Sequence, residues 1–372
     1  MFRVRLKHFL LPFIVLIAQA VPEIIMGNLC STYTEEKIPP IRRSKTLIPR
    51  LHSREPLDLS CFSIQKVLGS GSFGKVFLVT KKDTNKQYAM KAINKSSLNS
   101  SNKKIQALTE RELLAQVNSP FVVKLHFAFQ NQQKLFLVLD FLEGGELFGH
   151  LKRMQRFPEY IARFYAAEVL LALQDLHKRD IIYRDLKPEN ILLDRNGHVK
   201  LADFNLAKAM EGKRQLTSTM CGTPEYIAPE VLKGWPQGKQ VDFWGFGVLL
   251  FEMLDGRSPF RSSSCEDIFQ KILKNDYKFT NCVGESAQKL ISRLLDPSPK
   301  TRLSSLKAVM EHEFFEGVNW ELTRVKLSEA PFCNSEIEGL NSCSRIDLSP
   351  AAGDSNSAFT NFSFTESIED PN

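Results

Sequence analysis

Residues 183–190 of this chain read Tyr183-Arg184-Asp185-Leu186-Lys187-Pro188-Glu189-Asn190. A string this specific is not expected in an ordinary polar loop. Its Asp185 is suited to accept the proton of an attacking hydroxyl group, and Lys187 to contact a phosphoryl group in transfer. Asn190 can ligate Mg2+ through its amide oxygen. A lysine two positions after the aspartate favours Ser or Thr as the acceptor, so the string predicts phosphoryl transfer to a hydroxyl group.

A second magnesium ligand is expected downstream, in Asp203-Phe204-Asn205. The carboxylate of Asp203 would bridge the ion between the β- and γ-phosphates of ATP. The apolar runs 191–193 and 199–201 predict two short strands between Asp185 and Asp203, a separation suited to this chemistry.

A glycine-rich loop lies upstream, at residues 69–76. Glycines let backbone amides approach a phosphate chain closely. The pattern is weak alone, because dinucleotide-binding folds place it before a helix and a plain hairpin can also carry it. Here a strand is expected next, over 76–79, which favours a loop that covers the phosphates of ATP. The expected nucleotide contacts are Leu68, Gly69, Ser70, Gly71, Ser72, Phe73, Gly74, Lys75 and Val76.

Lys91, in a predicted strand over 87–93, is the candidate to hold the α- and β-phosphates. A strand lysine is usually a solvated surface residue, so this role requires a carboxylate that fixes its direction. Glu110, on a predicted helix over 105–117, is the first candidate and Glu112 the alternative. The two lie about 200° apart around a helix, so only one can face the site.

The hydrophobic pattern divides the chain into three parts. Residues 1–61 are an N-terminal extension and a Pro-rich linker, and 62–315 form the main domain. Residues 316–372, where periodicity fades, are expected to form a tail. Because β-runs precede amphipathic helices such as 158–177, the expected fold is α+β, with a small β-rich lobe that carries one main helix and a larger helical lobe. The main helix is expected to bury Ile105, Leu108, Leu113 and Val117.

Composition narrows the function classes. Hydrophobic residues make up 43% and charged residues 24% of the chain, values of a folded protein. The net charge is +7, and the Lys and Arg residues are spread through every segment, which argues against nucleic acid as a partner. The seven cysteines form no CxxC pair and no His-linked spacing, which argues against a zinc site or disulfide framework and for a reducing compartment.

The N-terminus allows three interpretations. A basic start, an apolar run over 9–18 and small residues at 18–20 are laid out like a secretory signal peptide. Residues 26–31, Met-Gly-Asn-Leu-Cys-Ser, instead match an N-myristoylation pattern if synthesis starts at Met26, with Cys30 as a second acylation site. The third interpretation is a misassigned upstream extension followed by a chance match. ATP chemistry favours a cytoplasmic location, and membrane contact rests on residues 1–31 alone.

One further segment completes the pattern, residues 221–230, Cys-Gly-Thr-Pro-Glu-Tyr-Ile-Ala-Pro-Glu. Its Glu230 is expected to pair with Arg302 inside a buried helical lobe. With this segment, residues 62–315 resemble a protein kinase domain. Tyr183 in place of the more usual His, the Cys221 segment and the aromatic tail resemble the AGC group. Residues 137–148 look closest to the ribosomal S-six kinases and the N-terminal domain of the p-ninety ribosomal kinases.

The resemblance implies a bilobal kinase fold that transfers the γ-phosphate of Mg-ATP to Ser or Thr of protein substrates. Asp140 and Leu142 match the hinge that meets adenine, and Leu139 matches the gatekeeper. Ala89 is a further expected nucleotide contact.

Three acidic residues match contacts to substrate. Glu146 matches a residue that contacts both ribose and a substrate arginine, and Glu189 and Glu252 match further contacts to substrate arginine. Together they imply protein substrates with basic residues upstream of the acceptor. Ordinary surface charge is the alternative interpretation of Glu146 and Glu252.

The resemblance also implies regulation by phosphorylation. Thr219 matches the activating site, and its phosphate would pair with Arg184 and Lys208. Ser349 is a weaker match to the turn-motif site, because it lies close to the third expected site, Ser363.

Residues 359–364, Phe-Thr-Asn-Phe-Ser-Phe, resemble the hydrophobic motif that contains Ser363. Phe359 and Phe362 would dock in a groove of the small lobe, and an upstream activating kinase would dock on the motif.

Two positions depart from the family pattern. Gln106 stands where many AGC kinases carry a His, and Asn205 stands where kinases carry Gly. Asn is the non-Gly residue that best tolerates positive φ, so Asn205 is expected to keep the active geometry and restrict switching. An alternative of another class is a pseudokinase scaffold with weak or no turnover, for which Asn205 is the only support.

Overall fold

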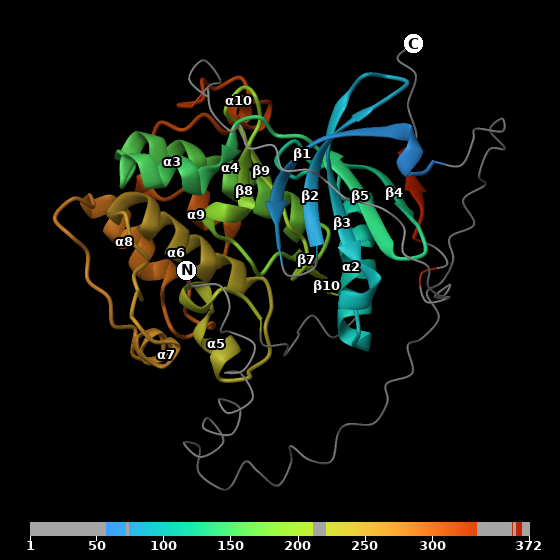
Figure 1. Ribbon diagram of the computed structural model, residues 1–372. Coiled ribbons are helices and arrows are strands. Elements are labelled where there is room, and N and C mark those ends of the chain that lie inside the picture. Colours follow the sequence, from blue (N-terminus) through green and yellow to red (C-terminus); the bar gives the residue numbers. More distant parts are fainter. Residues whose placement is uncertain (1–56, 72–73, 211–220, 333–358, 360–361, 367–372) are drawn as a thin grey trace, which may run out of the picture. The chain divides into compact units, whose positions relative to one another are not determined.

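The computed structural model describes residues 57–71, 74–210, 221–332, 359 and 362–366. They form the α+β arrangement that the sequence predicted, with a β-rich lobe followed by a helical lobe (Figure 1). No helix in these ranges combines the length and the apolar character that a membrane crossing requires.

The β-rich lobe is built on a six-stranded sheet with the order β1-β2-β3-β5-β4-β11, all neighbours antiparallel. Directly opposed residues share a face, so the register places Val76 beside Lys91, and Ala89 beside Leu139, on one face of the sheet. The strands are β1 (Phe62–Ser70), β2 (Gly74–Lys81), β3 (Gln87–Asn94), β4 (Leu125–Gln130), β5 (Lys134–Asp140) and β11 (Phe364–Thr365).

Gly74 allows β2 to pair closely with β3. A Cβ at this position would lie 1.8 Å from the carbonyl oxygen of Ala92, so no larger residue fits without moving the strands. The last glycine of the loop is therefore a packing requirement of the sheet as well as part of the predicted phosphate loop.

The main helix of this lobe is α2 (Ser101–Gln116), and the Oγ of Ser100 caps it by accepting a hydrogen bond from the N–H of Lys103 at 3.3 Å. The predicted burial is confirmed for Leu113 and Val117, and Leu108 is half-buried, but it is wrong for Ile105, which is 51% exposed. The helix instead also buries Ala107, Glu110 and Leu114. The apolar period misplaced Ile105 because the buried stripe includes a charged residue, Glu110, which a hydrophobic pattern does not count.

The helical lobe packs around α4 and α6, most of whose residues are buried. The helix α6 ends at Gly256, whose φ of +84° is the left-handed conformation that stops a helix. The helices are α3 (Leu147–Met154), α4 (Glu159–His177), α5 (Pro229–Leu232), α6 (Gln240–Asp255), α7 (Cys265–Lys274), α8 (Glu285–Leu294), α9 (Leu306–Met310) and α10 (Trp320–Arg324).

Short strands lie in the segments before and between these helices. A three-stranded sheet pairs in the order β6-β8-β9, and β10 pairs with β7. Their bounds are β6 (Gly145–Glu146), β7 (Ile181–Ile182), β8 (Ile191–Leu193), β9 (Val199–Leu201) and β10 (Lys208–Ala209). The strands predicted over 191–193 and 199–201 are confirmed.

The predicted tail, residues 316–372, contains the short helix α10. Arg324 in this helix places Nη1 2.7 Å from Oδ1 of Asp175 on α4, and Asn319 caps its first turn. A five-residue helix is too short for hydrophobic periodicity to reveal.

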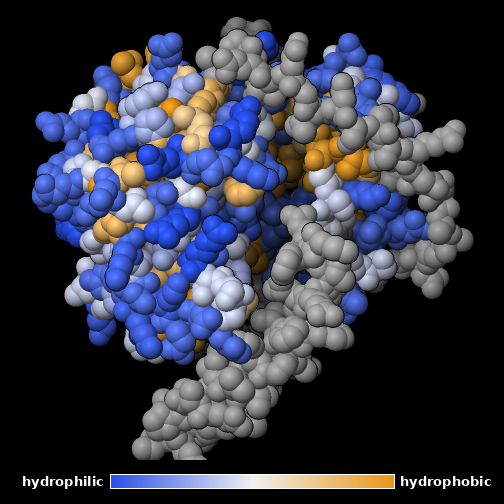
Figure 2. Space-filling model, turned by 60° about the vertical axis from the view of Figure 1, so that its left-hand side comes forward, coloured by the Kyte–Doolittle hydropathy of each residue, from blue (hydrophilic) through white to orange (hydrophobic). Residues whose placement is uncertain are grey.

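Hydrophilic residues dominate the face of the described chain that Figure 2 shows. The most exposed large apolar residues are Leu327 and Val325, which lie two positions apart, and Tyr160.

Candidate active site

Three oxygen atoms surround the ammonium group of Lys91 on β3. Its Nζ lies 2.6 Å from Oε1 of Glu110, 3.1 Å from Oδ1 of Asp203 and 3.3 Å from Oδ1 of Asn205. Burial by itself would lower the pKa of Lys91, but the carboxylates of Glu110 and Asp203 outweigh it and hold the pKa well above its usual value. Of the two carboxylates that the sequence left open, Glu110 makes the pair, and Glu112 is exposed.

Asp185 is 8% exposed and is held from three sides. The Nδ2 of Asn190 donates to Oδ2 of Asp185 at 2.8 Å, and the Nζ of Lys187 lies 3.0 Å from the same oxygen. The hydroxyl of Thr223 donates to Oδ1 of Asp185 at 3.3 Å and accepts from the Nζ of Lys187 at 2.9 Å. These bonds fix the carboxylate that the sequence predicted as the catalytic base.

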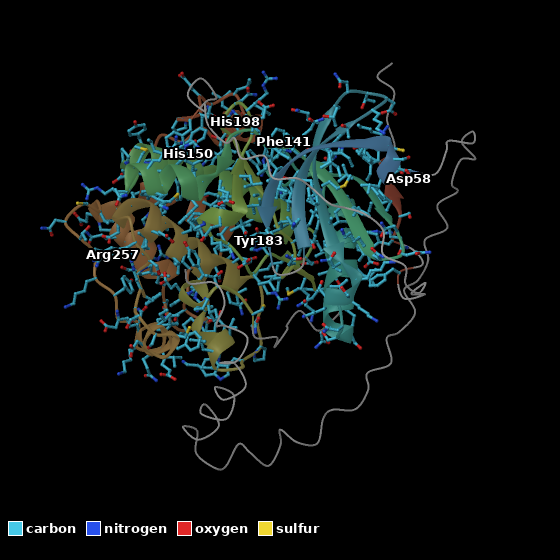
Figure 3. All side chains as sticks on the ribbon, viewed as in Figure 1. Asp58, Phe141, His150, Tyr183, His198 and Arg257 are labelled. Carbon is cyan, nitrogen blue, oxygen red and sulfur yellow. The ribbon has the colours of Figure 1, made fainter. Side chains whose placement is uncertain are left out.

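Asp242 near the start of α6 holds the loop on which Asp185 lies, and the sequence analysis missed it. Its carboxylate accepts the backbone N–H groups of Tyr183 at 3.0 Å and of Arg184 at 2.8 Å, and it contacts Nε2 of His177 at 2.7 Å. Arg184 has a positive φ of 66°, a conformation that the two bonds from Asp242 keep in place. Figure 3 labels Tyr183, the first residue of this loop. A single aspartate in the apolar run 241–250 was the available signal.

Asp203, and not Asn205, takes the left-handed conformation in the second predicted metal loop. Its φ is 56°, and Asn205 is absent from the described non-glycine residues with positive φ. The expectation that Asn205 tolerates positive φ is therefore not needed in this conformation, because its backbone lies in a region open to any residue. Burial would raise the pKa of Asp203, but Lys91 offsets it, so the pKa lies below its usual value and the side chain stays anionic.

The donor set fits Mg2+ bound together with a nucleotide. Among the described residues, no three His, Cys, Asp or Glu side chains form a metal cluster. Mg2+ does not require one, because it usually takes one or two carboxylates, substrate phosphates and water. The side chain of Asp203 is 41% exposed, and Asn190 bonds Asp185 through its nitrogen, which leaves its oxygen available as a ligand.

The predicted nucleotide contacts lie on the strands and turns next to Lys91. Gly69 and Gly71 have no atom within 4 Å of the place where a Cβ would stand, so their backbone is open to a ligand. Leu68 is 40% exposed on β1. Lys75, Val76 and Ala89 lie on β2 and β3, and Ser70 ends β1. Ser72 and Phe73 lie outside the described residues.

Asp140 ends β5 where the chain leaves the sheet, followed by Phe141, which Figure 3 labels, and by half-buried Leu142. The backbone N–H of Asp140 donates to the carbonyl of Lys124 at 3.1 Å. This tie fixes the start of the predicted hinge against the segment that precedes β4.

Two of the three predicted substrate carboxylates line one pocket of about 360 Å³ in the helical lobe. Glu189 and Glu252 share it with Glu225, which the sequence analysis missed although it lies in the quoted 221–230 segment. Arg257, labelled in Figure 3, and Arg261 are also among its lining residues. Glu146 lies elsewhere, on β6 at the start of α3.

The pocket carboxylates affect each other. Burial raises the pKa of Glu252 to about 7, and the negative charges of Glu189 and Glu225 add to this, against a hydrogen bond that the hydroxyl of Tyr226 donates. A cation in this pocket would relieve the repulsion.

Of the three predicted phosphorylation sites, the structure describes Ser363. Thr219 and Ser349 lie outside the described residues. Phe359 and Phe362 are 1% and 0% exposed, and Ser363 between the motif phenylalanines is exposed. Arg184, one expected partner of a phosphate on Thr219, donates from Nε to the carbonyl of Leu206 at 2.7 Å, and its buried Nη1 has no partner among the described residues.

The comparison with protein families decides the identity of the fold. Residues 62–315 match the protein kinase domain model. The chain belongs to the protein kinase family. Individual relatives support a serine/threonine type. Serine/threonine-protein kinase gad8 of Schizosaccharomyces pombe is 47% identical over 279 residues, which cover 74% of this chain and 49% of that protein.

Two further kinases match over similar lengths. The cAMP-dependent protein kinase type 3 of Saccharomyces cerevisiae is 42% identical over 297 residues, 79% of this chain and 74% of its own length. RAC-beta serine/threonine-protein kinase of Mus musculus is 42% identical over 284 residues, 75% of this chain and 59% of its own. These relatives are kinases of the AGC group. The chain spans about half the length of gad8 and 32% of protein kinase 3 of Dictyostelium discoideum.

Proposed function

We propose that this chain is an AGC-type serine/threonine protein kinase that transfers the γ-phosphate of Mg-ATP to protein substrates. The observation that carries the proposal is the complete catalytic set, in which Lys91 is paired with Glu110 and Asp203, and Asp185 is held by Asn190, Lys187 and Thr223. Phosphate transfer to Ser or Thr of a protein, measured against Asp185→Asn, tests it.

In the proposed reaction, Lys91 binds the α- and β-phosphates and Glu110 keeps its ammonium pointed at them. Asp203 and Asn190 would hold Mg2+, which would supply positive charge beside the phosphates. Asp185 accepts the hydrogen bond of the substrate hydroxyl, orients it for in-line attack and takes its proton. Lys187, 3.0 Å from the carboxylate of Asp185, contributes positive charge beside the attacked phosphoryl group.

The scaffold alternative rests on Asn205 alone. Asn205 does not require the left-handed backbone, and its amide oxygen instead accepts a bond from Lys91. A closer relationship to the ribosomal S-six kinases and the N-terminal domain of the p-ninety kinases remains a proposal that rests on residues 137–148.

Activation by phosphate on Thr219 and Ser363 belongs to the same proposal. The buried, unpartnered Nη1 of Arg184 in the described chain supports a phosphate at Thr219, because an unsatisfied guanidinium nitrogen is costly until an acceptor arrives. The burial of Phe359 and Phe362 supports docking of the hydrophobic motif. We propose a cytoplasmic location, with membrane contact through residues 1–31.

Substrate arginine is proposed to bind the Glu189, Glu225 and Glu252 pocket, which gives a pH dependence. With a pKa of about 7, Glu252 is mostly protonated at pH 6 and mostly ionised at pH 8. A guanidinium pairs with the ionised form, so KM for a peptide with an upstream Arg should fall as pH rises from 6 to 8, by at most about tenfold for one site. Steady-state kinetics across this range measure it.

Two controls isolate Glu252. A peptide with Ala in place of the Arg should show no such fall, and Glu252→Gln should flatten the profile for the Arg peptide. A KM that rises with pH for the Arg peptide would remove Glu252 from substrate binding.

A further inference from the structure

A series of four hydrogen-bonded side chains, those of Glu366, His126, Asp140 and Lys200, connects the C-terminal segment to the hinge. Oε2 of Glu366 lies 2.9 Å from Nδ1 of His126, and Nε2 of His126 lies 2.7 Å from Oδ1 of Asp140. Oδ2 of Asp140 accepts from the Nζ of Lys200 at 2.8 Å. Glu366 also pairs with Lys124. The residues come from four separate parts of the sequence, which the fold brings together.

His126 is bound at both ring nitrogens. Each nitrogen faces a carboxylate oxygen, and a carboxylate only accepts, so both nitrogens can donate at once only in the protonated ring. The side chain is 10% exposed, and the ring of Tyr88 packs on it at 5.0 Å between centroids. A ring held by two charged partners in partial burial has little freedom to turn.

Backbone pairing sets Glu366 in place. In β11, Phe364 pairs with Ala128 and Thr365 with Phe127 of β4, and the N–H of Glu366 donates to the carbonyl of His126 at 3.0 Å. Figure 1 shows β11 as the red arrow beside β4. This segment thus extends the sheet by one strand, and Glu366, which follows the strand, contacts His126, the residue that bonds the hinge.

Within this series of side chains, Asp140 is the residue that belongs to the predicted adenine hinge. Its Oδ2 accepts the backbone N–H of Lys124 at 3.1 Å, in addition to Lys200. Burial would raise the pKa of Asp140, but His126 and Lys200 outweigh it and hold the pKa well below its usual range. With its side chain fixed in this way, Asp140 offers the hinge backbone in one position.

We propose that Glu366 and His126 are positioning residues for the adenine hinge, so that docking of residues 362–366 on β4 raises affinity for the adenosine part of the nucleotide. The inference rests on the proposed ATP-binding function. The contacts from Glu366 through His126 to Asp140 are all made between side chains of this protein, so they form without a bound ligand.

The tail also touches α2, and this second route must be separated from the first. Arg111 donates from Nε to the carbonyl of Phe362 at 3.1 Å and from Nη2 to that of Ser363 at 3.4 Å. Because α2 carries Glu110, an effect through Arg111 would act on Lys91 and hence on the phosphates. An effect through His126 would act on adenosine, which has no phosphates.

Calorimetric Kd values of the full chain for adenosine and for Mg-ADP distinguish the two routes. We expect Glu366→Gln to weaken both ligands by the same factor, about threefold or more. Thr365→Ala changes an exposed residue of β11 that is not part of the series from Glu366 to Lys200, and it should leave both affinities unchanged. In a His126→Gln background, Glu366→Gln should cause no further loss of affinity, because Glu366 acts on the hinge through His126.

Three results would overturn the proposal: an adenosine affinity of Glu366→Gln equal to that of the wild type, a loss confined to Mg-ADP, or full additivity with His126→Gln. The first two leave the proposed kinase function intact. A wild-type chain that binds neither ligand would instead defeat the proposed function together with this inference. The measurement on the single variant Glu366→Gln tests the proposal even if His126→Gln does not fold. Glu366→Gln itself is expected to fold, since the side chain of Glu366 is partly exposed.

Discussion

Asp185→Asn is expected to lower kcat by about 10² to 10⁴-fold, the range that a positioned general base contributes. The amide keeps the size of the side chain and can still meet the Nδ2 of Asn190 through its oxygen, but it cannot take the proton of the substrate hydroxyl. Affinity for Mg-ADP should change little, because the lysine that holds the phosphates, Lys91, makes its own bonds to Glu110 and Asp203. Single-turnover kinetics with nucleotide binding in parallel measure both quantities.

The matched control is Asp180→Asn. Asp180 is half-exposed and pairs with Lys239 at 2.6 Å, away from the catalytic set, so its kcat should stay near that of the wild type. A kcat for Asp185→Asn within about tenfold of the wild type would be too small for loss of a general base and would remove Asp185 from that role.

Arg302→Ala is expected to lower the free energy of unfolding by about 3–5 kcal/mol, the usual cost of removing one partner of a buried ion pair. Nη1 and Nη2 of Arg302 meet the two carboxylate oxygens of Glu230 at 2.6 and 2.8 Å, and both side chains are fully buried. The pair that the sequence predicted is therefore confirmed. Its loss leaves the charge of Glu230 uncompensated beside Trp244, over which the guanidinium lies at 5.0 Å.

Urea unfolding followed by tryptophan fluorescence gives the comparison, with Lys307→Ala as the control. Lys307 on α9 pairs with Glu311 at 3.7 Å, and the two side chains are 83% and 64% exposed. Loss of such a surface pair should leave the midpoint almost unchanged. An Arg302→Ala midpoint as close to the wild type as that of Lys307→Ala would show that the buried pair contributes little to stability.

The residues with local signatures could be predicted from the sequence, and those that act through distant contacts could not. Asp185, Lys187 and Asn190 stand within one short string, so their spacing alone indicated their chemistry. Asp242 holds the same loop from 59 and 58 positions away in the sequence, and only the folded chain shows the bonds it accepts from Tyr183 and Arg184.

Glu225 and Thr223 were missed for a related reason. Both lie in the quoted 221–230 segment, but their roles depend on which side chains the fold brings opposite them, Glu252 for one and Asp185 for the other. The choice between Glu110 and Glu112 was open for the same reason, because helical geometry shows that the two diverge but does not show which one faces Lys91.

Asn205 does not use the positive φ that its place in the family pattern suggested. The family pattern of a glycine suggested positive φ at this position, whereas the structure gives positive φ to Asp203, two positions earlier. The sequence does not indicate which residue of a turn takes the left-handed conformation when Asp and Asn, the two residues that most readily adopt it, both stand in the loop.

The central claim is phosphate transfer by the Asp185 site, and one measurement tests it most directly. The full chain, with a phosphate on Thr219 verified by mass spectrometry, is incubated with Mg-ATP labelled at the γ-phosphate and a protein substrate that carries Arg upstream of Ser or Thr. The account predicts label on Ser or Thr of the substrate that disappears with Asp185→Asn. Label no higher in the wild type than in Asp185→Asn would contradict it.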